Sequence, residues 1–205
     1  MILKDILDTA RYSELSNLAI KDNNEAIVTF LNMGMLELYK RFPIKVEEAT
    51  ITLIANSSTY NLPLNFMYPL GAYGEDKDGN ISPTKELATN AEDDDNSVFF
   101  PNHRQIQIPS TIKGTRVSVV YVAKPESYTA ANLDVEVFLP DTLVEPLLHY
   151  IGYKGHLGVR SDGQSENNAH YIRFDSSVKK ARELGVAYPS DSWRMAGRLF
   201  ERGFA

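Results

Sequence analysis

The sequence predicts an α+β protein: a small helical bundle formed by both ends of the chain, an inserted antiparallel β lobe resembling a sandwich or barrel, and an extended C-terminal tail. Apolar residues recur with the helical period of about 3.6 up to Pro43 and again after Pro140. Between these prolines the period changes to about 2, which is typical of strands. The expected domains are residues 1–43, 44–138 and 139–188, followed by a tail of residues 189–205.

Residues 23–42 form the main predicted helix. Asn23 or Asn24 can cap its first turn by accepting a free backbone N–H, and Pro43 cannot continue it. The apolar face expected to pack in the core consists of Ile27, Phe30, Leu31, Met35, Leu38, Tyr39 and Phe42. Such a wide face needs partners, and the only comparable helical patterns lie about a hundred residues later, so the fold must bring the two ends of the chain together.

The middle of the chain has the alternation of short strands. Residues 46–54 and 59–62 flank a turn-forming Asn-Ser-Ser and are predicted to pair as a hairpin. Residues 116–122 have apolar side chains on both faces, which favours a central strand. Further strands are expected at residues 66–73, at Ile81 up to Pro83, and at 98–100, 104–108 and 135–139, the last as an edge strand.

Two helices are predicted in the C-terminal part. The first begins near Thr142, and three glycines at its end, Gly152, Gly155 and Gly158, would let another helix approach closely. The second covers about residues 165–184. Its expected core positions are Ala169, Ile172, Val178 and Ala181.

Composition excludes several classes of protein. The net charge is −6, whereas nucleic-acid-binding proteins are usually basic. The chain has no cysteine, so disulfides and thiolate sites are excluded. Its first residues are too charged for a signal peptide, and no apolar run is long enough to cross a membrane.

Candidate catalytic and metal-binding groups have simpler structural explanations. His149 and His156 share a helix face but lack an HExxH pattern, and His170 is expected on a helix surface. Residues 76–80 fit a hairpin turn better than a calcium loop. The acidic run Glu92, Asp93, Asp94 and Asp95 is expected to be a solvated loop. No nucleophile elbow or phosphate-binding loop is present, so we expect neither an enzyme nor a cofactor.

The C-terminal tail is rich in residues that contribute binding energy at interfaces. Its arginines recur every four residues, and its aromatic side chains occupy another side of the same helical pattern. The residues expected to contact a partner are Trp193, Arg194, Arg198, Leu199, Phe200, Arg202 and Phe204. The alternative is that this segment folds back onto its own subunit.

Segments spread along nearly the whole chain resemble the head-to-tail adaptor, or connector, proteins of short-tailed bacteriophages. The matching segments are Glu14–Ile20, Phe30–Ile44, Ser58–Pro63, Val117–Pro125 and Leu139–Gly155. The resemblance rests on the pattern of these segments and not on a catalytic signature.

This resemblance implies a structural virion protein at the head-tail junction, assembled in the host cytoplasm. It would form a dodecameric ring with copies of itself, bind the portal protein through its C-terminal tail, and support the tail nozzle. Packaged DNA would pass through the ring without specific binding, because an acidic lumen repels phosphates. The loop at residues 92–95 is a candidate for the channel wall.

Two other functions remain open from the sequence. One is a different head-completion or tail structural protein, which would differ in its partners. The other is a carbohydrate-binding β module, in which tyrosines would stack on sugar rings. Its candidate residues are Tyr60, Tyr68, Tyr73 and Tyr121.

Overall fold

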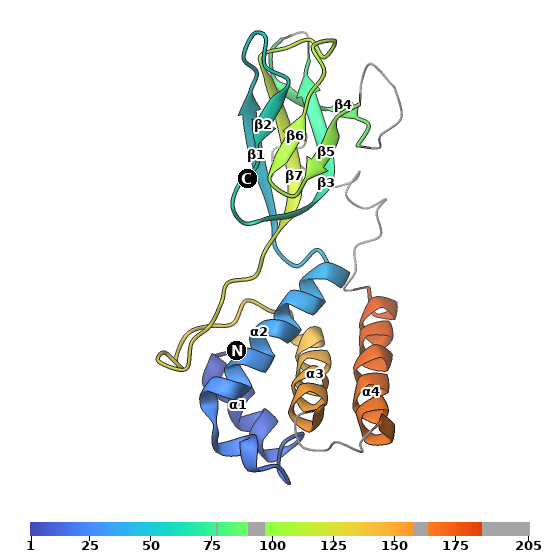
Figure 1. Cartoon of the computed structure of the whole chain (residues 1–205). Helices are drawn as coiled ribbons and strands as arrows, with labels where there is room; N and C mark the ends of the chain where they lie inside the picture. The colour runs from blue at the N-terminus through green and yellow to red at the C-terminus, as the bar shows by residue number, and fades with distance from the viewer. Residues whose placement is uncertain (77, 90–96, 158–163, 186–205) are drawn as a thin grey trace. The chain divides into compact units, whose positions relative to one another are not determined.

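The computed structural model describes residues 1–76, 78–89, 97–157 and 164–185. The chain divides into two compact units, shown in Figure 1. The helical unit contains Met1–Ile44 together with the chain from Pro125 to the last helix, and the β unit contains Lys45–Lys124. The predicted α+β class is confirmed.

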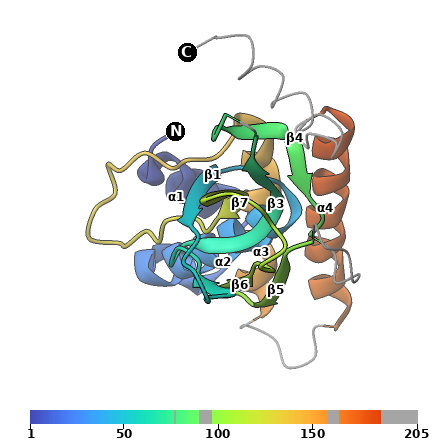
Figure 2. The ribbon, with the colours of Figure 1, turned by 90° about the horizontal axis from the view of Figure 1, so that it is seen from above.

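The helical unit is built from both ends of its chain. Its elements are α1 (Leu3–Tyr12), the short 3₁₀ helix η1 (Ala19–Asp22), α2 (Asn24–Arg41), the 3₁₀ turn η2 (Asp141–Leu143), α3 (Val144–Leu157) and α4 (Gln164–Glu183). Asn23 caps α2, because its side-chain oxygen accepts a hydrogen bond from the backbone N–H of Ala26. Helix α3 lies between α2 and α4, as Figures 1 and 2 show. It therefore contributes to packing on two sides.

The apolar face of α2 lies in the core of this unit. Its buried side chains are Ile27, Val28, Leu31, Met35, Leu38 and Tyr39, followed by the C-cap residue Phe42. Phe30 is only half-buried. Leu147 and Ile151 of α3 are fully buried as well.

The core face of α4 differs from the predicted one. Ala169 is exposed and Ile172 is 63% exposed, so both expected core positions are wrong. The buried positions of the described side chains are Phe174, Ser177, Val178 and Ala181. These are spaced by three, one and three residues, which places them on one helix face, opposite to Ile172.

Residues 125–140 belong to the helical unit and pack along its helices instead of forming the predicted edge strand. Its one bridge pairs Glu136 with Ile2. The side chain of Asn32 both donates to the carbonyl oxygen of Tyr128 and accepts from its N–H, each at 2.9 Å. Tyr39 donates its hydroxyl to the carbonyl oxygen of Phe138 at 3.1 Å. The alternating apolar residues that suggested a strand thus belong to an extended segment, which is hydrogen-bonded to α2 and to the N-terminal residues.

The β unit consists of two antiparallel sheets. Its strands are β1 (Val46–Thr52), β2 (Thr59–Asn61), β3 (Phe66–Glu75), β4 (Ile81–Leu87), β5 (Phe99–Asn102), β6 (Gln105–Gln107) and β7 (Arg116–Ala123). The order is β1-β7-β3-β4 in one sheet and β2-β6-β5 in the other. Strand β7 is internal, as predicted, and Val117 and Val119 are fully buried. A single hydrophobic core includes these valines, Phe66 and, from the second sheet, Ile106.

Two further predictions for the strands are wrong. Strands β1 and β2 do not form a hairpin, since β1 pairs with β7 and β2 pairs with β6 in the other sheet. Pro83 does not end its strand either, because β4 continues to Leu87. β4 is an edge strand whose pairing is irregular between Ile81 and Glu86, and an edge strand tolerates a missing backbone N–H.

Candidate functional site

A partly buried polar cluster in the helical unit gathers three histidines around one glutamate. Glu14 lies in the turn after α1, His149 and His156 lie on α3, and His170 lies on α4. His149 Nδ1 is 3.2 Å from Glu14 Oε1, and His156 Nε2 is 3.1 Å from the main-chain carbonyl oxygen of Glu14. The rings of His156 and His170 stack with their centroids 4.1 Å apart. We call these four residues the Glu14–histidine cluster.

Two glycines allow this turn to lie directly against α3. A Cβ at Gly152 would be 2.7 Å from Glu14 Oε2 and 3.0 Å from Glu14 Cβ, closer than side chains tolerate. A Cβ at Gly155 would overlap the side chain of Leu15, which is fully buried. The close approach predicted at these glycines therefore occurs, but the approaching segment is a turn and not a helix.

The cluster shifts the pKa values of its members in opposite directions. The hydrogen bond from His149 lowers the pKa of Glu14, and the same bond raises the pKa of His149. Burial lowers the pKa of His170, with a further contribution from the neighbouring His156. Within the described residues no group of three or more His, Cys, Asp or Glu is arranged to hold a metal ion. The geometry of the cluster therefore does not indicate a metal centre.

The sequence predicted structural histidines but not their common partner. Glu14 stands far from all three along the chain, so no local spacing indicates the contact. The shared helix face of His149 and His156 was predictable from their separation. His170 was expected on the helix surface, yet its side chain is only 16% exposed.

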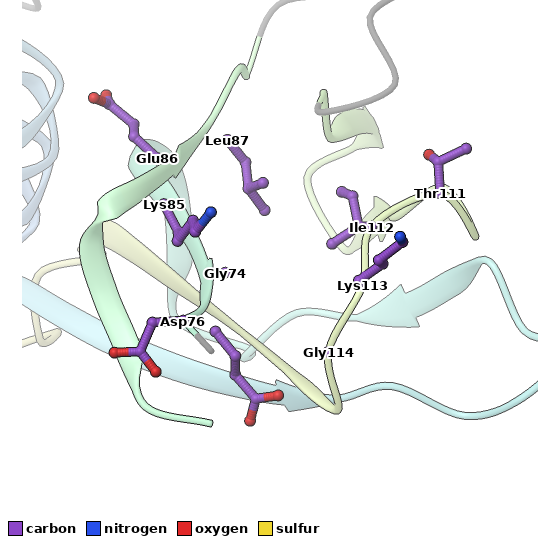
Figure 3. A pocket seen from close by; sticks show the side chains of 10 residues that line it. Gly74, Asp76, Lys85, Glu86, Leu87, Thr111, Ile112, Lys113 and Gly114 are labelled. Carbon is purple, nitrogen blue, oxygen red and sulfur yellow. The ribbon is translucent and has the colours of Figure 1, made fainter. Parts of the chain in front are cut away.

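A pocket of about 610 Å³ lies in the β unit, between the ends of β3 and β4 and the loop before β7 (Figure 3). Lys85 and Leu87 are on the side of β4 that faces this loop, whereas Glu86 points away, as the alternation of a strand requires. The lining residues are Gly74, Glu75, Asp76, Lys85, Glu86, Leu87, Thr111, Ile112, Lys113 and Gly114. Both charge signs are present, so the lining does not select one class of ligand.

Glu75 fixes the loop that borders this pocket. Its carboxylate accepts hydrogen bonds from the backbone N–H of Thr115 at 2.6 Å and from Arg116 Nε at 2.8 Å. Arg116 Nη2 in turn donates to the carbonyl oxygen of Gly79 at 2.7 Å. The hydrogen bond from the Thr115 backbone, together with Arg116, lowers the pKa of Glu75 to about 2.

We expect the β unit to lose stability in acid through Glu75. Its pKa is lower in the folded chain, so its contribution is present above the ordinary value of 4.5 and is lost as the pH falls from there to about 2. Glu75→Gln should flatten this part of the pH profile, measured by urea unfolding at several pH values. Glu86→Gln is the matched control, because its side chain points away from the loop. An unchanged acid profile in Glu75→Gln would contradict this assignment.

Two of the four tyrosines considered for sugar binding form hydrogen bonds within the β unit. Tyr121 is 3% exposed, and its hydroxyl donates to Glu47 Oε2 at 2.9 Å. The hydroxyl of Tyr60 bonds to the backbone of Ile54 and Ser57 in the turn after β1. These two rings are therefore held by the β unit itself. Tyr68 and Tyr73 are half-buried on β3.

Two predicted sites fall outside the described residues. These are the partner-binding positions Trp193, Arg194, Arg198, Leu199, Phe200, Arg202 and Phe204, and the acidic run Glu92, Asp93, Asp94 and Asp95. Among the described helices, none combines the length and the apolar character needed to cross a membrane.

Comparison with known proteins identifies the family. No curated protein matches the chain. The family model described as SU10 adaptor protein matches residues 1–198, which include both units and more than half of the C-terminal tail. A match over nearly the whole chain cannot arise from one shared motif. The chain belongs to the SU10 adaptor protein family, a family of phage head-to-tail adaptors, and is a structural component of the virion.

Proposed function

We propose that this adaptor forms a dodecameric ring between the portal and the tail nozzle and extends the DNA channel. The observation that carries the proposal is the family match over residues 1–198, because it extends from the first helix into the C-terminal tail. In this role the protein acts by assembly and has no catalytic turnover. Assembly takes place in the host cytoplasm, and the ring serves both genome packaging and genome ejection.

The acidic character of the chain suits a conduit for DNA. Each copy carries a net charge of −6, so a ring of twelve is strongly negative. A lumen of that sign repels phosphates at distances within a Debye length of about 8 Å at physiological salt. DNA would therefore slide past the wall without specific binding. The acidic run at residues 92–95 is one candidate for this wall.

The three parts of the chain have different roles in this proposal. The helical unit, built from residues 1–44 and the chain from Pro125 to α4, provides the rigid body, and the β unit, Lys45–Lys124, faces neighbouring subunits or the nozzle. The tail, residues 189–205, docks on the portal. Arginine and aromatic side chains are concentrated in the tail, and these residue types contribute most energy at protein interfaces.

Cosedimentation with the portal ring from the same genome tests this proposal. The full chain is expected to bind stoichiometrically, and the chain ending at Pro189 is expected not to bind. Far-ultraviolet circular dichroism should show that the truncated chain keeps the melting curve of the full chain. A lower melting temperature would mean that the tail belongs to the folded core instead.

A finer variant separates the tail's side chains from its length. Replacing Arg194, Arg198 and Arg202 together by alanine should weaken portal binding by at least about 100-fold, since each arginine at an interface centre contributes about 1–2 kcal/mol. Lys179→Ala with Lys180→Ala, which removes exposed charges from α4, is the control and should bind normally. If the full chain itself does not cosediment, a different head-completion or tail role becomes the better explanation.

A further inference from the structure

The two sheets of the β unit end in four edge strands, and three of these are poorly suited to pair with another chain. Strand β4 contains Pro83, pairs irregularly with β3, and is followed by a bridge from Ala88 to Ser97. Strand β5 contains Pro101 and is also irregular, and β2 has only three residues. Prolines, irregular pairing and short length are ways in which proteins protect the edges of their sheets from unwanted strands.

The fourth edge strand, β1, lacks these protections. All seven of its residues, Val46–Thr52, pair with β7 in an unbroken register, and none of them is proline. In the part of the chain that the structure describes, β1 has no partner strand on its other side, and it forms the margin of its sheet (Figure 1). A regular edge of this length is a template to which an extended segment can add as a further strand.

The register shows which backbone groups of β1 face outward. The N–H of Ala123 donates to the carbonyl oxygen of Lys45 at 2.9 Å, and the N–H of Leu53 donates to the carbonyl oxygen of Thr115 at 2.7 Å. Hydrogen-bonded and non-hydrogen-bonded pairs alternate in an antiparallel ladder, so the odd-numbered residues between these two ends bond to β7. The outward-facing N–H and C=O groups therefore belong to Val46, Glu48, Thr50 and Thr52.

The side chains along this edge indicate what kind of strand fits beside it. Glu48, Thr50 and Thr52 are exposed, whereas Ile51 belongs to the hydrophobic core and Ala49 packs against it. The carboxylate of Glu48, which accepts a hydrogen bond from the hydroxyl of Ser118, places a negative charge near the middle of the edge. Opposite charges on directly paired residues stabilise a sheet, so an added strand is expected to have a lysine or arginine opposite Glu48.

An open pocket begins where β1 ends. Its volume is about 640 Å³, and its apolar lining consists of Leu53, Ile54, Tyr60, Ile108, Pro109 and Ile112. The side chain of Ile54 is 66% exposed. A strand that runs along β1 and continues past Thr52 would bring one of its side chains to this pocket. When strands add to an edge, main-chain hydrogen bonds provide affinity and such pockets select the side chain.

A second copy of this chain does not fit this edge in a ring. Antiparallel pairing of β1 with another β1 requires a two-fold axis, which a cyclic head-to-tail ring lacks. Parallel pairing would place twelve strands about 4.8 Å apart on a circle of roughly 60 Å circumference, which leaves no channel for DNA. The other edges of a neighbouring copy are short, irregular or interrupted by proline. The occupant is therefore expected to come from a different protein.

We propose that the edge of β1 takes up an extended, basic segment of the tail nozzle protein as an additional strand. The main chain of this segment bonds to the outward-facing groups of β1, a lysine or arginine lies opposite Glu48, and an apolar side chain reaches the pocket at Ile54. The proposal rests on the proposed function, because it takes the nozzle as the partner of the β unit, while the portal is assigned to the C-terminal tail.

A proline in the middle of β1 tests this edge without breaking the sheet. The N–H of Thr50 faces outward, so Thr50→Pro removes a donor for the added strand but none of the hydrogen bonds to β7. On portal rings that carry the adaptor, this variant should bind the nozzle protein of the same genome at least about tenfold more weakly in cosedimentation. Thr50→Val keeps both the N–H and the branched shape and should bind as the wild type does. Unchanged nozzle binding by Thr50→Pro would overturn the proposal.

The amount of adaptor on the portal is measured in the same sediment, and it separates this test from that of the proposed function. Thr50→Pro should load onto the portal as the wild type does. A wild-type adaptor that binds the portal but takes up no nozzle protein would overturn the strand addition, while its attachment to the portal would stand.

Hydrogen exchange of the wild-type chain provides a second arm that depends neither on a variant nor on the portal. In the adaptor alone, the amides of Glu48, Thr50 and Thr52 should exchange fast, and the odd-numbered amides of β1 should exchange slowly. Added nozzle protein should slow the first set by at least about tenfold and leave the second set unchanged. The amides are read individually by NMR after transfer to an aprotic solvent. Equal exchange with and without nozzle protein would overturn the proposal, and protection by the portal alone would show that the portal occupies this edge instead.

Discussion

Leu31→Ala is expected to lower the free energy of unfolding of the helical unit by about 3 kcal/mol. Leu31 is fully buried on the face of α2 that meets the core. Truncation removes the transfer free energy of the lost carbons and leaves a cavity that a close-packed core fills only in part. Equilibrium urea unfolding followed by far-ultraviolet circular dichroism measures the loss, because this signal reports mainly on helices.

The neighbouring residue provides a matched control. Phe30→Ala removes a larger side chain, but Phe30 is half-buried, so the expected loss is only about 1 kcal/mol. The smaller side chain should therefore give the larger effect. If Phe30→Ala costs more than Leu31→Ala, the core-facing side of α2 has been assigned wrongly.

Gly155→Leu is expected to destabilise the same unit by about 2–3 kcal/mol. The new side chain would enter space that Leu15 and Leu18 occupy, since a Cβ alone already overlaps Leu15 and lies 3.4 Å from Leu18 Cδ1. Overpacking of this kind forces side chains out of their rotamers or moves the backbone. The loss should appear in urea unfolding although leucine is a better helix former than glycine.

Leucine introduced one position earlier, at residue 154, distinguishes steric crowding at residue 155 from the general effect of adding a leucine to α3. Lys154 is half-buried, and its ammonium group lies over the rings of Tyr150 and Tyr153. Lys154→Leu removes these contacts but inserts no atoms into the core, so its cost should stay within about 1 kcal/mol. Equal destabilisation by both leucine variants would mean that the turn after α1 does not rest on α3.

The helices could be predicted because the apolar period and the capping residues that define a helix lie within it or next to it in the sequence. The apolar period and the end signals of α2 predicted residues 23–42, and the helix covers Asn24–Arg41 with Asn23 as its cap. The face of α4 was misassigned because Ala169 and Ile172 also fit a helical period. Phe174 was recognised as a buried position only from its contacts with Tyr150 of α3 and Arg41 of α2, whereas the buried positions Val178 and Ala181 were predicted from the helical period.

The partners of the strands could not be predicted in the same way. Alternation indicates which residues are extended, but not which strand lies beside them. β1 and β2 are close in sequence and belong to different sheets, whereas β1 pairs with β7, whose residues come much later. Strand β7 was recognised as central because apolar residues on both faces are a property of the strand alone.

The Glu14–histidine cluster depends on tertiary structure for the same reason. Its local signals were the helix face shared by His149 and His156 and the pair of glycines, Gly152 and Gly155, which predicted a close neighbour on α3. The identity of that neighbour required the position of the turn after α1. For the tail, the sequence still supplies the whole argument, and its portal-binding positions remain a prediction.

The discontinuous helical unit has a consequence for how the chain folds during synthesis. Residues 1–44 leave the ribosome first, but α3 and α4 follow only after the β unit has been made. Translation at about 5–20 residues per second leaves the apolar faces of α1 and α2 without their partners for roughly 5–20 s. The β unit is contiguous, so it can fold within this interval, whereas the nascent helices are exposed to aggregation. Folding of the helical unit is therefore expected to be the step that benefits most from chaperones, because its core is complete only after α3 and α4 have been synthesised.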